Sequence, residues 1–176
     1  MAELHGWRFC PRCGAELAVE PTRAVCPGCG SVYYANSAPT VGALCEDDLG
    51  RLMLVRSGVE PRKGKWDTPG GFLEEGEPPL DGLRRELREE TGLEIEPGEF
   101  FGALTDLYGD GADAQSILSL NWTARILSGT PAPADDISEI RWFAADELPG
   151  EDEIGFASVA ELVQLWRERR GWSAAR

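Results

Sequence analysis

Basic side chains are scarce in this sequence: 17 lysines and arginines stand against 31 aspartates and glutamates, a formal net charge of −14 over 176 residues. Nucleic-acid backbones and anionic membrane surfaces are themselves negatively charged, so this imbalance argues against both as nonspecific partners. A small anionic substrate can still bind to a chain of this net charge when a metal ion supplies positive charge at the site. We therefore expect no membrane binding and no nonspecific nucleic-acid binding.

Long apolar runs are also missing. No stretch approaches the ~18 consecutive apolar residues of a membrane-spanning helix, and residues 1–9 lack the apolar segment of a signal peptide. These absences predict a cytoplasmic protein whose thiols stay reduced. With 42% hydrophobic and 27% charged residues, the composition is that of a globular chain that buries a core.

Four of the five cysteines form two matching pairs, Cys10-Pro-Arg-Cys13 and Cys26-Pro-Gly-Cys29, and each pair is followed by glycine. Two thiolates two residues apart can reach one tetrahedral ion, and the glycine permits the positive φ of a tight knuckle. The pattern resembles a zinc ribbon over about residues 8–34. Two disulfides or four separate buried thiols are the alternatives, and the repeated knuckle in a reducing compartment favours structural Zn²⁺.

Segments after the ribbon predict a mixed sheet with two helices. Residues 39–45 and 51–56 are apolar runs joined by a polar turn, which indicates a hairpin with Cys45 buried in its first strand. Further strands are expected at 100–107, 115–126 and 137–143. In the second of these, polar residues that include Ser119, Asn121 and Thr123 alternate with apolar ones, as in a half-buried strand.

Two helices complete the expected α+β fold. Prolines open and Gly92 closes a helix over residues 78–91, and Ser158 to Glu161 fits a capping box that begins a second helix ending near residue 170. Hairpin strands with two well-separated helices indicate a sheet covered by helices. We expect a ribbon at residues 1–36 and a larger domain at 37–176.

The first helix separates its charges. At 100° per residue it carries an apolar stripe of Leu80, Leu83 and Leu87 beside an acidic stripe of Glu86, Glu89 and Glu90. Glutamates at i,i+3 and i,i+4 spacing repel one another unless a cation binds between them. Carboxylate oxygens in a chain with a single histidine, His5, to which we assign no role, favour Mg²⁺ or Mn²⁺. A solvated acidic face is the alternative.

The segment around this helix resembles the Nudix box at every fixed position: Gly71, five residues, Glu77, seven residues, then Arg85-Glu86-apolar-x-Glu89-Glu90-x-Gly92-apolar. The lead-in Lys65-Trp-Asp-Thr-Pro-Gly-Gly71 is also similar to that of Nudix proteins. The resemblance extends loosely over about residues 38–170 and implies a Nudix-type α/β/α sandwich with a mixed sheet. Gly82, in the middle of the helix, costs ~1 kcal/mol relative to alanine, and we expect it to touch no functional position.

What the resemblance implies is hydrolysis of a nucleoside diphosphate linked to another moiety, with Mg²⁺ or Mn²⁺ as cofactor. Carried over by position, Glu86, Glu89 and Glu90 hold metal, and the backbone carbonyl of Gly71 is a further ligand. Glu77 pairs with Arg85 and so orients the glutamates. Attack of water on phosphorus is then assisted by metal ions that neutralise the phosphates.

The general base is open, because it varies in the family. Glu89 is one candidate, and an acid from a later loop is another: Asp106, Asp110, Asp113, Asp135, Asp136 or Glu139. Each of these later acids has solvated loop charge as its alternative explanation. The residues that contact the phosphates or the base of the substrate are also undecided. The candidates are Arg56, Arg62, Lys65 and Tyr108, and each is equally consistent with a surface position that has no such role.

A ribbon followed by a Nudix domain is similar both to NADH pyrophosphatases and to shorter enzymes that act on FAD or ADP-ribose. The first group carries a Ser-Gln-Pro-Trp-Pro-Phe-Pro string shortly after the box, and residues 100–108 lack it. We therefore expect cleavage of FAD, ADP-ribose or a similar dinucleotide or nucleotide sugar. The alternatives are NADH pyrophosphatase or RNA-decapping-like activity, a non-catalytic sensor, and a ribbon that binds nucleic acid. The family resemblance also makes a homodimer a reasonable expectation.

Overall fold

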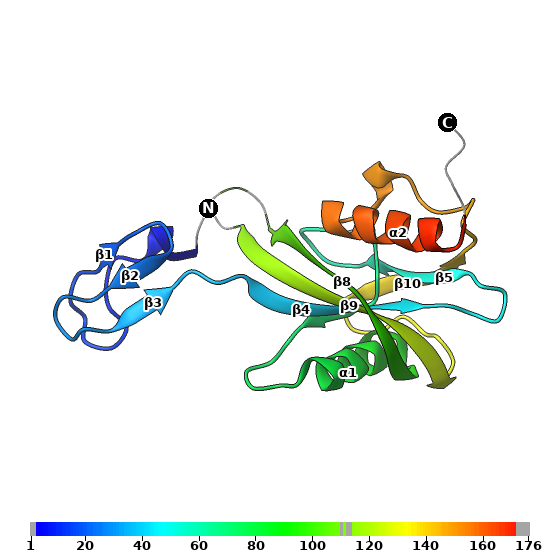
Figure 1. Ribbon diagram of the computed structural model, residues 1–176, viewed down its shortest axis with the longest axis horizontal. Coiled ribbons are helices and arrows are strands. Elements are labelled where there is room, and N and C mark those ends of the chain that lie inside the picture. The colour runs from blue at the N-terminus through cyan, green and yellow to red at the C-terminus, as the bar shows by residue number, and fades with distance from the viewer. Residues whose placement is uncertain (1–2, 110, 112–113, 172–176) are drawn as a thin grey trace. The chain divides into compact units, whose positions relative to one another are not determined.

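The computed structural model describes residues 3–109, 111 and 114–171, without the side chains of Glu3 and His5. Its contacts divide into two compact units, Met1–Ala38 with Leu107–Ile117 and Pro39–Asp106 with Leu118–Arg176, which we describe separately. Figure 1 labels their main helices and strands. None of the helices in the described ranges combines the length and the apolar character that crossing a membrane requires.

The first unit contains a three-stranded antiparallel sheet in the order β1-β2-β3. Its elements are the 3-10 helix η1 (Glu3–Gly6), β1 (Ala18–Val19), β2 (Arg23–Val25) and β3 (Val32–Tyr34). The buried residues beneath one face of the sheet are Leu4, Cys10, Leu17, Ala24 and Cys26. A core this small buries little apolar surface, and modules of this size ordinarily need a bound metal or disulfides to stay folded.

Seven further strands form two sheets, in the orders β7-β4-β9-β8 and β10-β5-β6. The strands are β4 (Ala38–Cys45), β5 (Leu52–Ser57), β6 (Trp66–Asp67), β7 (Gly70–Phe72), β8 (Glu94–Tyr108), β9 (Gln115–Ser128) and β10 (Ile137–Phe143). The helices are α1 (Pro79–Thr91), the 3-10 helix η3 (Glu151–Glu153) and α2 (Ala157–Arg169). The expected strands and both helices are therefore present, with β8 longer than the sequence pattern indicated.

The expected hairpin of the first two long strands is wrong. A single antiparallel bridge between Glu46 and Leu52 joins them, after which β4 pairs with β7 and β9 while β5 pairs with β6 and β10. Residues 41–45 of β4 and 52–55 of β5 are apolar or glycine and buried at every position, so each run is covered on two faces, and separating the strands into different sheets provides those faces. A continuous apolar run in the sequence does not specify which strand it pairs with in the sheet.

The core forms two layers because side chains alternate along β4 and β5. Helices α1 and α2 lie on opposite sides of the sheets in Figure 1. Toward α2 the buried set includes Leu44, Leu52, Leu54, Leu162 and Trp166. Toward α1 it includes Val41, Cys45, Met53, Leu83 and Leu87. The buried position expected for Cys45 is confirmed, and burial raises the pKa of this thiol to about 12.

Helix α1 begins with proline in its first turn and ends at Gly92, whose φ of 71° and N–H bond to the Arg88 carbonyl form a left-handed cap. Leu83 and Leu87 are fully buried, but Leu80 is 39% exposed, so the apolar stripe is shorter than expected. Gly82 also differs from expectation. A Cβ there would lie 2.4 Å from Leu73 Cδ2 and 2.8 Å from Glu77 Oε2, so the missing side chain lets the preceding loop pack on the helix beside Glu77.

Helix α2 does not use the expected capping box. It begins at Ala157 with Phe156 as the N-cap and no side-chain capping bond from that residue. The backbone N–H of Ser158 instead donates to Asp106 Oδ2 at 2.8 Å. A carboxylate from β8 thus satisfies an N-terminal N–H of α2 and meets the positive end of its dipole, a partner that the local sequence could not reveal.

Candidate active site and cysteine cluster

The four cysteine sulfurs of the ribbon converge. All four ligand atoms lie within 4.8 Å of one another, and each thiol is free rather than bonded as a disulfide. Gly14 and Gly30 have φ of 74° and 73°, and their N–H groups bond to the carbonyls of Cys10 and Cys26 at 2.9 Å. These are the two tight knuckles that the sequence predicts, and four convergent thiols are the donor set that zinc takes.

The three glutamates of α1 differ sharply in their surroundings. Glu90 is only 6% exposed, and its Oε2 accepts the N–H of Gly70 at 2.9 Å. The Glu86 side chain is largely covered, whereas the Glu89 side chain is 52% exposed. The acidic stripe therefore runs from a buried carboxylate to one open to solvent, which a uniformly solvated helix face does not do.

Arg85 links the helix to the loop before it. Its Nε and Nη2 donate to the two oxygens of Glu77 at 2.8 Å each, a bidentate pair. Its Nη1 donates to Glu86 at 2.9 Å and to Glu89 at 3.1 Å, and Nη2 also reaches the Phe72 carbonyl at 3.1 Å. One guanidinium thus orients two of the three glutamates and braces the loop.

Glycine at position 71 lets Glu86 approach the backbone. A Cβ on Gly71 would lie 2.5 Å from Glu86 Oε2 and 2.7 Å from Oε1, so any side chain there would displace this carboxylate. At the preceding position, Gly70 has φ of 147°, and a Cβ would lie 2.1 Å from the Val41 carbonyl oxygen. The pair of glycines therefore brings backbone amide and carbonyl groups directly against the glutamates of α1.

Burial and charge shift the acidities of this group in opposite directions. Burial raises the pKa of Glu90 to about 9, opposed by the Gly70 hydrogen bond and reinforced by the charges of Asp136 and Glu86. Burial also raises the pKa of Glu86, opposed by Arg85. Hydrogen bonds from Arg85 and from the Glu74 backbone lower the pKa of Glu77 to about 2. Glu86 and Glu90 are therefore the carboxylates whose charged forms a neighbouring cation would stabilise most.

The acidic residues fit divalent cations by donor type and by placement. Among described residues, only the cysteines bring three or more ligating side chains within 4.8 Å of one another, so the glutamates do not surround a single point. Arg85 draws Glu86 and Glu89 to one side, and Gly70 holds Glu90 on the other. Hard oxygen donors spread in this way, next to a half-buried glycine backbone, suit Mg²⁺ or Mn²⁺.

Two of the alternative general bases already have structural partners. Asp106 accepts the Ser158 N–H, and Glu139 pairs with Arg56 at 3.2 Å. Asp135 and Asp136 are exposed, and the Asp136 charge contributes to the raised pKa of Glu90. The remaining candidates, Asp110 and Asp113, lie outside the described residues.

Sequence reasoning gave no role to Asp67. It lies on β6 opposite Val55, and its Oδ1 accepts the Thr68 N–H at 2.7 Å. Desolvation raises the pKa of Asp67 to about 7, with a further contribution from the charge of Asp106. The available signal was an acid next to the buried Trp66 in the lead-in. Another buried polar group, Asn121, is 1% exposed, although its strand pattern placed it on the half-buried polar side.

The basic candidates lie in or beside the segment between β5 and β6 and are engaged locally. Arg56 Nε donates to the Gly64 carbonyl at 2.8 Å, and its guanidinium lies 5.2 Å from the Trp66 ring. Arg62 lies 4.9 Å from the Phe156 ring, and Lys65 Nζ donates to the Asp152 carbonyl at 2.5 Å. Tyr108 also makes an interaction. These contacts connect the lead-in to the segment before α2.

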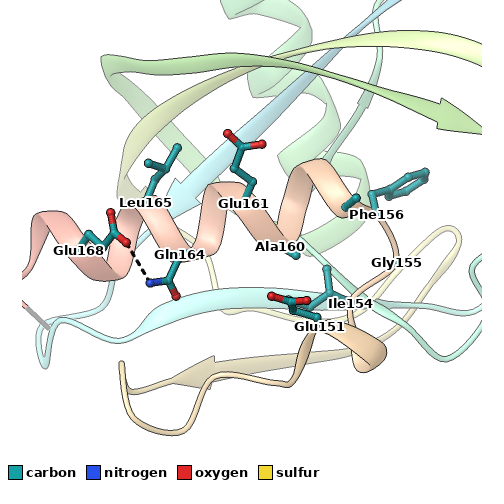
Figure 2. Close-up of a pocket in the computed structure, with 10 residues that line it drawn as sticks. Glu151, Ile154, Gly155, Phe156, Ala160, Glu161, Gln164, Leu165 and Glu168 are labelled. Carbon is teal, nitrogen blue, oxygen red and sulfur yellow. Dashed lines mark hydrogen bonds between the residues drawn. The ribbon is translucent and has the colours of Figure 1, made fainter. Parts of the chain in front are cut away.

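A groove of about 600 Å³ runs along the outer face of α2 (Figure 2). Ile154, Phe156 and Leu165 give it apolar walls, and Glu151, Glu161 and Glu168 stand at its edges. Gln164 donates to Glu168 at 3.1 Å across one turn. None of the Nudix-box glutamates lines it, so this groove and the candidate active site are separate features.

Comparison with known proteins agrees with the fold and the motif. The NUDIX domain family model matches residues 36–164. A crystal structure of a NUDIX hydrolase from Nitrosomonas europaea superposes with a TM-score of 0.76 at 26% identity, covering 94% of this chain and 93% of that one. The Nudix-type sandwich expected from the sequence is therefore confirmed.

Among curated proteins, the chain is 33% identical over 169 residues to a protein of Stutzerimonas stutzeri named NAD-capped RNA hydrolase NudC, covering 93% of this chain and 57% of that protein. A protein of the same name from Pseudomonas aeruginosa is 32% identical, covering 95% and 58%. A human mitochondrial NAD(P)H pyrophosphatase is 29% identical over 80% of this chain. The chain thus spans less than three fifths of the length of these relatives. With the domain match and the box residues together, it belongs to the Nudix hydrolase family.

Proposed function

We propose that this protein hydrolyses the pyrophosphate bond of an NAD(H)-type dinucleotide, free or at the 5′ end of RNA, with Mg²⁺ or Mn²⁺ as cofactor. The observation that carries the reaction is the Arg85-centred group of glutamates packed against Gly71. The family match supports the reaction class, because Nudix proteins act on nucleoside diphosphates linked to another moiety.

The proposed division of labour follows the surroundings of each side chain. Glu86 and Glu90, the two covered carboxylates, hold divalent ions together with Glu89 and the Gly71 carbonyl. Glu89 is the most exposed of the three and is also the best placed to take a proton from attacking water. Glu77 fixes Arg85, which keeps Glu86 and Glu89 aimed. Bound divalent ions supply charge neutralisation at the phosphates and lower the pKa of water.

The substrate preference proposed here differs from the one that the sequence alone favoured. The absence of the Ser-Gln-Pro-Trp-Pro-Phe-Pro string pointed toward FAD or ADP-ribose. The relatives that match most of this chain are instead named for NAD-capped RNA and NAD(P)H, which favours the alternative. Absence of one string is weak evidence in comparison, since other residues can recognise the same dinucleotide.

Structural Zn²⁺ in the ribbon is part of the same proposal. Four free thiols converge within 4.8 Å, and the Tyr33 hydroxyl lies 3.4 Å from the Cys10 sulfur, a donor set and neighbour that suit zinc.

A substrate panel tests the function. Purified protein with Mg²⁺ is given NADH, NAD-capped RNA, FAD, ADP-ribose, a nucleotide sugar and a nucleoside triphosphate, and products are identified by mass. The proposal expects NMN-type and AMP-type products from NADH, or a 5′-monophosphate RNA from capped RNA, with the highest kcat/KM among the panel. A higher kcat/KM for FAD or ADP-ribose contradicts the preference, and the absence of metal-dependent turnover on every compound contradicts the enzyme.

A further inference from the structure

The ribbon exposes an unusual share of apolar surface. Of the thirteen large apolar side chains exposed in the described residues, five lie between Trp7 and Tyr34, in about a sixth of the chain. They are Trp7, Phe9, Val19, Val32 and Tyr34. Tyr34 is 62% exposed and Phe9 58%. Exposed apolar surface concentrated on a small module typically marks a binding surface rather than a core.

Strand register places part of this surface on one side of the ribbon sheet. On β2 and β3, Ala24 and its neighbour Tyr33 face the cysteine-containing core. Alternation puts Val32 and Tyr34 on the opposite side, and their partners across the ladder are Val25 and Arg23. We call these four residues the open face. Tyr34 is thus the ladder partner of Arg23, whose guanidinium also donates to the Glu20 carboxylate at 2.8 Å.

Charge separates the ribbon from the rest of the chain. Residues 1–38 contain three arginines and three glutamates and no lysine or aspartate, so their formal charge is zero. The whole net charge of −14 is therefore carried by residues 39–176. Zinc bound to four thiolates would add about −2 to the ribbon, which still leaves it the least acidic part of the chain. The argument from total charge against nucleic acid applies to the larger domain and loses most of its force for the ribbon.

We propose that the open face of the ribbon binds unpaired bases of the RNA that follows an NAD cap, by stacking on Tyr34 with the Arg23 guanidinium beside it. Aromatic rings on an exposed sheet bind single-stranded nucleic acid with little sequence preference, and arginine adds a cation–π contribution. Elsewhere in the ribbon the Arg8 guanidinium lies 5.4 Å from the Phe9 ring, a cation–π pairing. The inference rests on the proposed function, and the matches to relatives named for NAD-capped RNA extend over 93% and 95% of this chain, which includes most of the ribbon.

The test compares two substrates in one enzyme. Zinc-loaded protein and its Tyr34→Ala variant are assayed on free NADH and on an unstructured NAD-capped RNA of about 16 nucleotides. Loss of one stacked base is expected to raise KM for the capped RNA about tenfold, with KM and kcat for NADH unchanged. Tyr34→Phe, which keeps the ring, is expected to behave as the parent. Phe100→Ala is the matched control, since this aromatic is also exposed but lies on β8.

Equal behaviour of the Tyr34→Ala variant and the parent on capped RNA overturns the inference, as does an equal loss on both substrates, and either result leaves the proposed function standing. If the parent cleaves neither substrate, the proposed function fails, and binding of a labelled single-stranded RNA to the parent and to Tyr34→Ala, measured by fluorescence anisotropy, still tests the ribbon. Sedimentation of the parent and of Tyr34→Ala tests whether a second copy of the chain, rather than RNA, binds the open face. A change from dimer to monomer in Tyr34→Ala assigns the open face to a second copy of the chain and overturns the RNA inference.

Discussion

In the ribbon, four sulfur atoms lie within 4.8 Å of one another, whereas in the Nudix domain the three glutamates of α1 are held apart by Arg85 and Gly70. The first site is local, because two short knuckles with glycine at positive φ bring the thiols together. The second is composite: it needs a helix, the loop before it, and a glycine backbone from β7.

This difference follows from the chemistry of the ligands. When soft thiolates bind one zinc ion, their positions become fixed, and the free energy of binding stabilises a module that has almost no hydrophobic core. Hard carboxylates around Mg²⁺ must stay accessible to water and phosphate, so they are fixed by neighbours rather than by one another. The comparison predicts that catalysis is sensitive to single changes around α1 and insensitive to loss of the ribbon's metal.

The largest effect is expected from Glu89→Gln, which keeps the shape of the side chain and removes its charge. Turnover of the best substrate should fall about 10³-fold, because a ligand and a proton acceptor are lost together. Steady-state kinetics at saturating Mg²⁺ measure this, with circular dichroism to confirm the fold. Glu75→Gln, an exposed loop acid outside the fixed positions of the box, is the control and should match the parent. Parental turnover in Glu89→Gln would refute the metal-site assignment.

A smaller effect is expected from Glu77→Gln, which weakens the bidentate pair with Arg85. The glutamates that Arg85 orients should become less well placed, lowering kcat about 10- to 100-fold and raising the Mg²⁺ concentration needed for half activity. Glu94→Gln, at the start of β8, is a matched control, because Glu94 pairs with Arg88 of α1 at 2.5 and 2.8 Å on an exposed flank. Equal losses in the two variants would mean that the pairs only stabilise the helix.

The third prediction concerns pH. Desolvation places the folded-state pKa of Asp67 at about 7, above its ordinary value of 3.8, so the native state binds this proton more tightly than the unfolded chain does. Its contribution to stability is therefore full below about pH 4 and is lost as the pH rises toward 7. Asp67→Asn should raise the free energy of unfolding by about 2 kcal/mol at pH 8 in Mg²⁺-free buffer. Urea unfolding at pH 4 and pH 8 checks this, and a gain that is the same at both values would assign it to another cause.

The smallest effect on hydrolysis is expected from the ribbon. Elemental analysis should find one zinc per chain in the parent, and Cys13→Ser should lose most of it and become protease-sensitive around residues 8–34. Turnover of free NADH should nevertheless stay within about threefold, since the ribbon forms its own compact unit. A parent without zinc would contradict the ribbon assignment, and collapse of NADH turnover in Cys13→Ser would break the contrast between the two sites.

Local patterns predicted a large part of this structure. The cysteine knuckles, the limits of α1 and the Gly92 cap all follow from spacing and from residues whose backbone preferences are strong. The pairing of segments that are distant in sequence did not follow from local patterns. The strands β4 and β5 separate into different sheets, Asp106 replaces the expected cap of α2, and Gly82 proves to be needed for the packing of Leu73 and Glu77. Each of these depends on a contact between residues far apart in sequence or on opposite sides of a loop, which periodicity does not encode.

For the same reason, the sequence did not reveal which polar side chains lose contact with water. Asp67 and Asn121 occur in short polar contexts that resemble those of solvated residues, and only the assembled sheets show that Asn121 is buried and Asp67 partly so. Their spacing placed the box glutamates on one helix face, but the gradient from buried Glu90 to half-exposed Glu89 could not be read from a helical wheel.

Arg85 has one more consequence. Its guanidinium already neutralises part of the charge on Glu77, Glu86 and Glu89, so it serves as an internal counterion for the helix. We expect this counterion to keep α1 and its loop folded when divalent ions are removed, so that activity follows the concentration of free Mg²⁺ reversibly. Removal of zinc from the ribbon is expected to leave its thiolates without a comparable counterion.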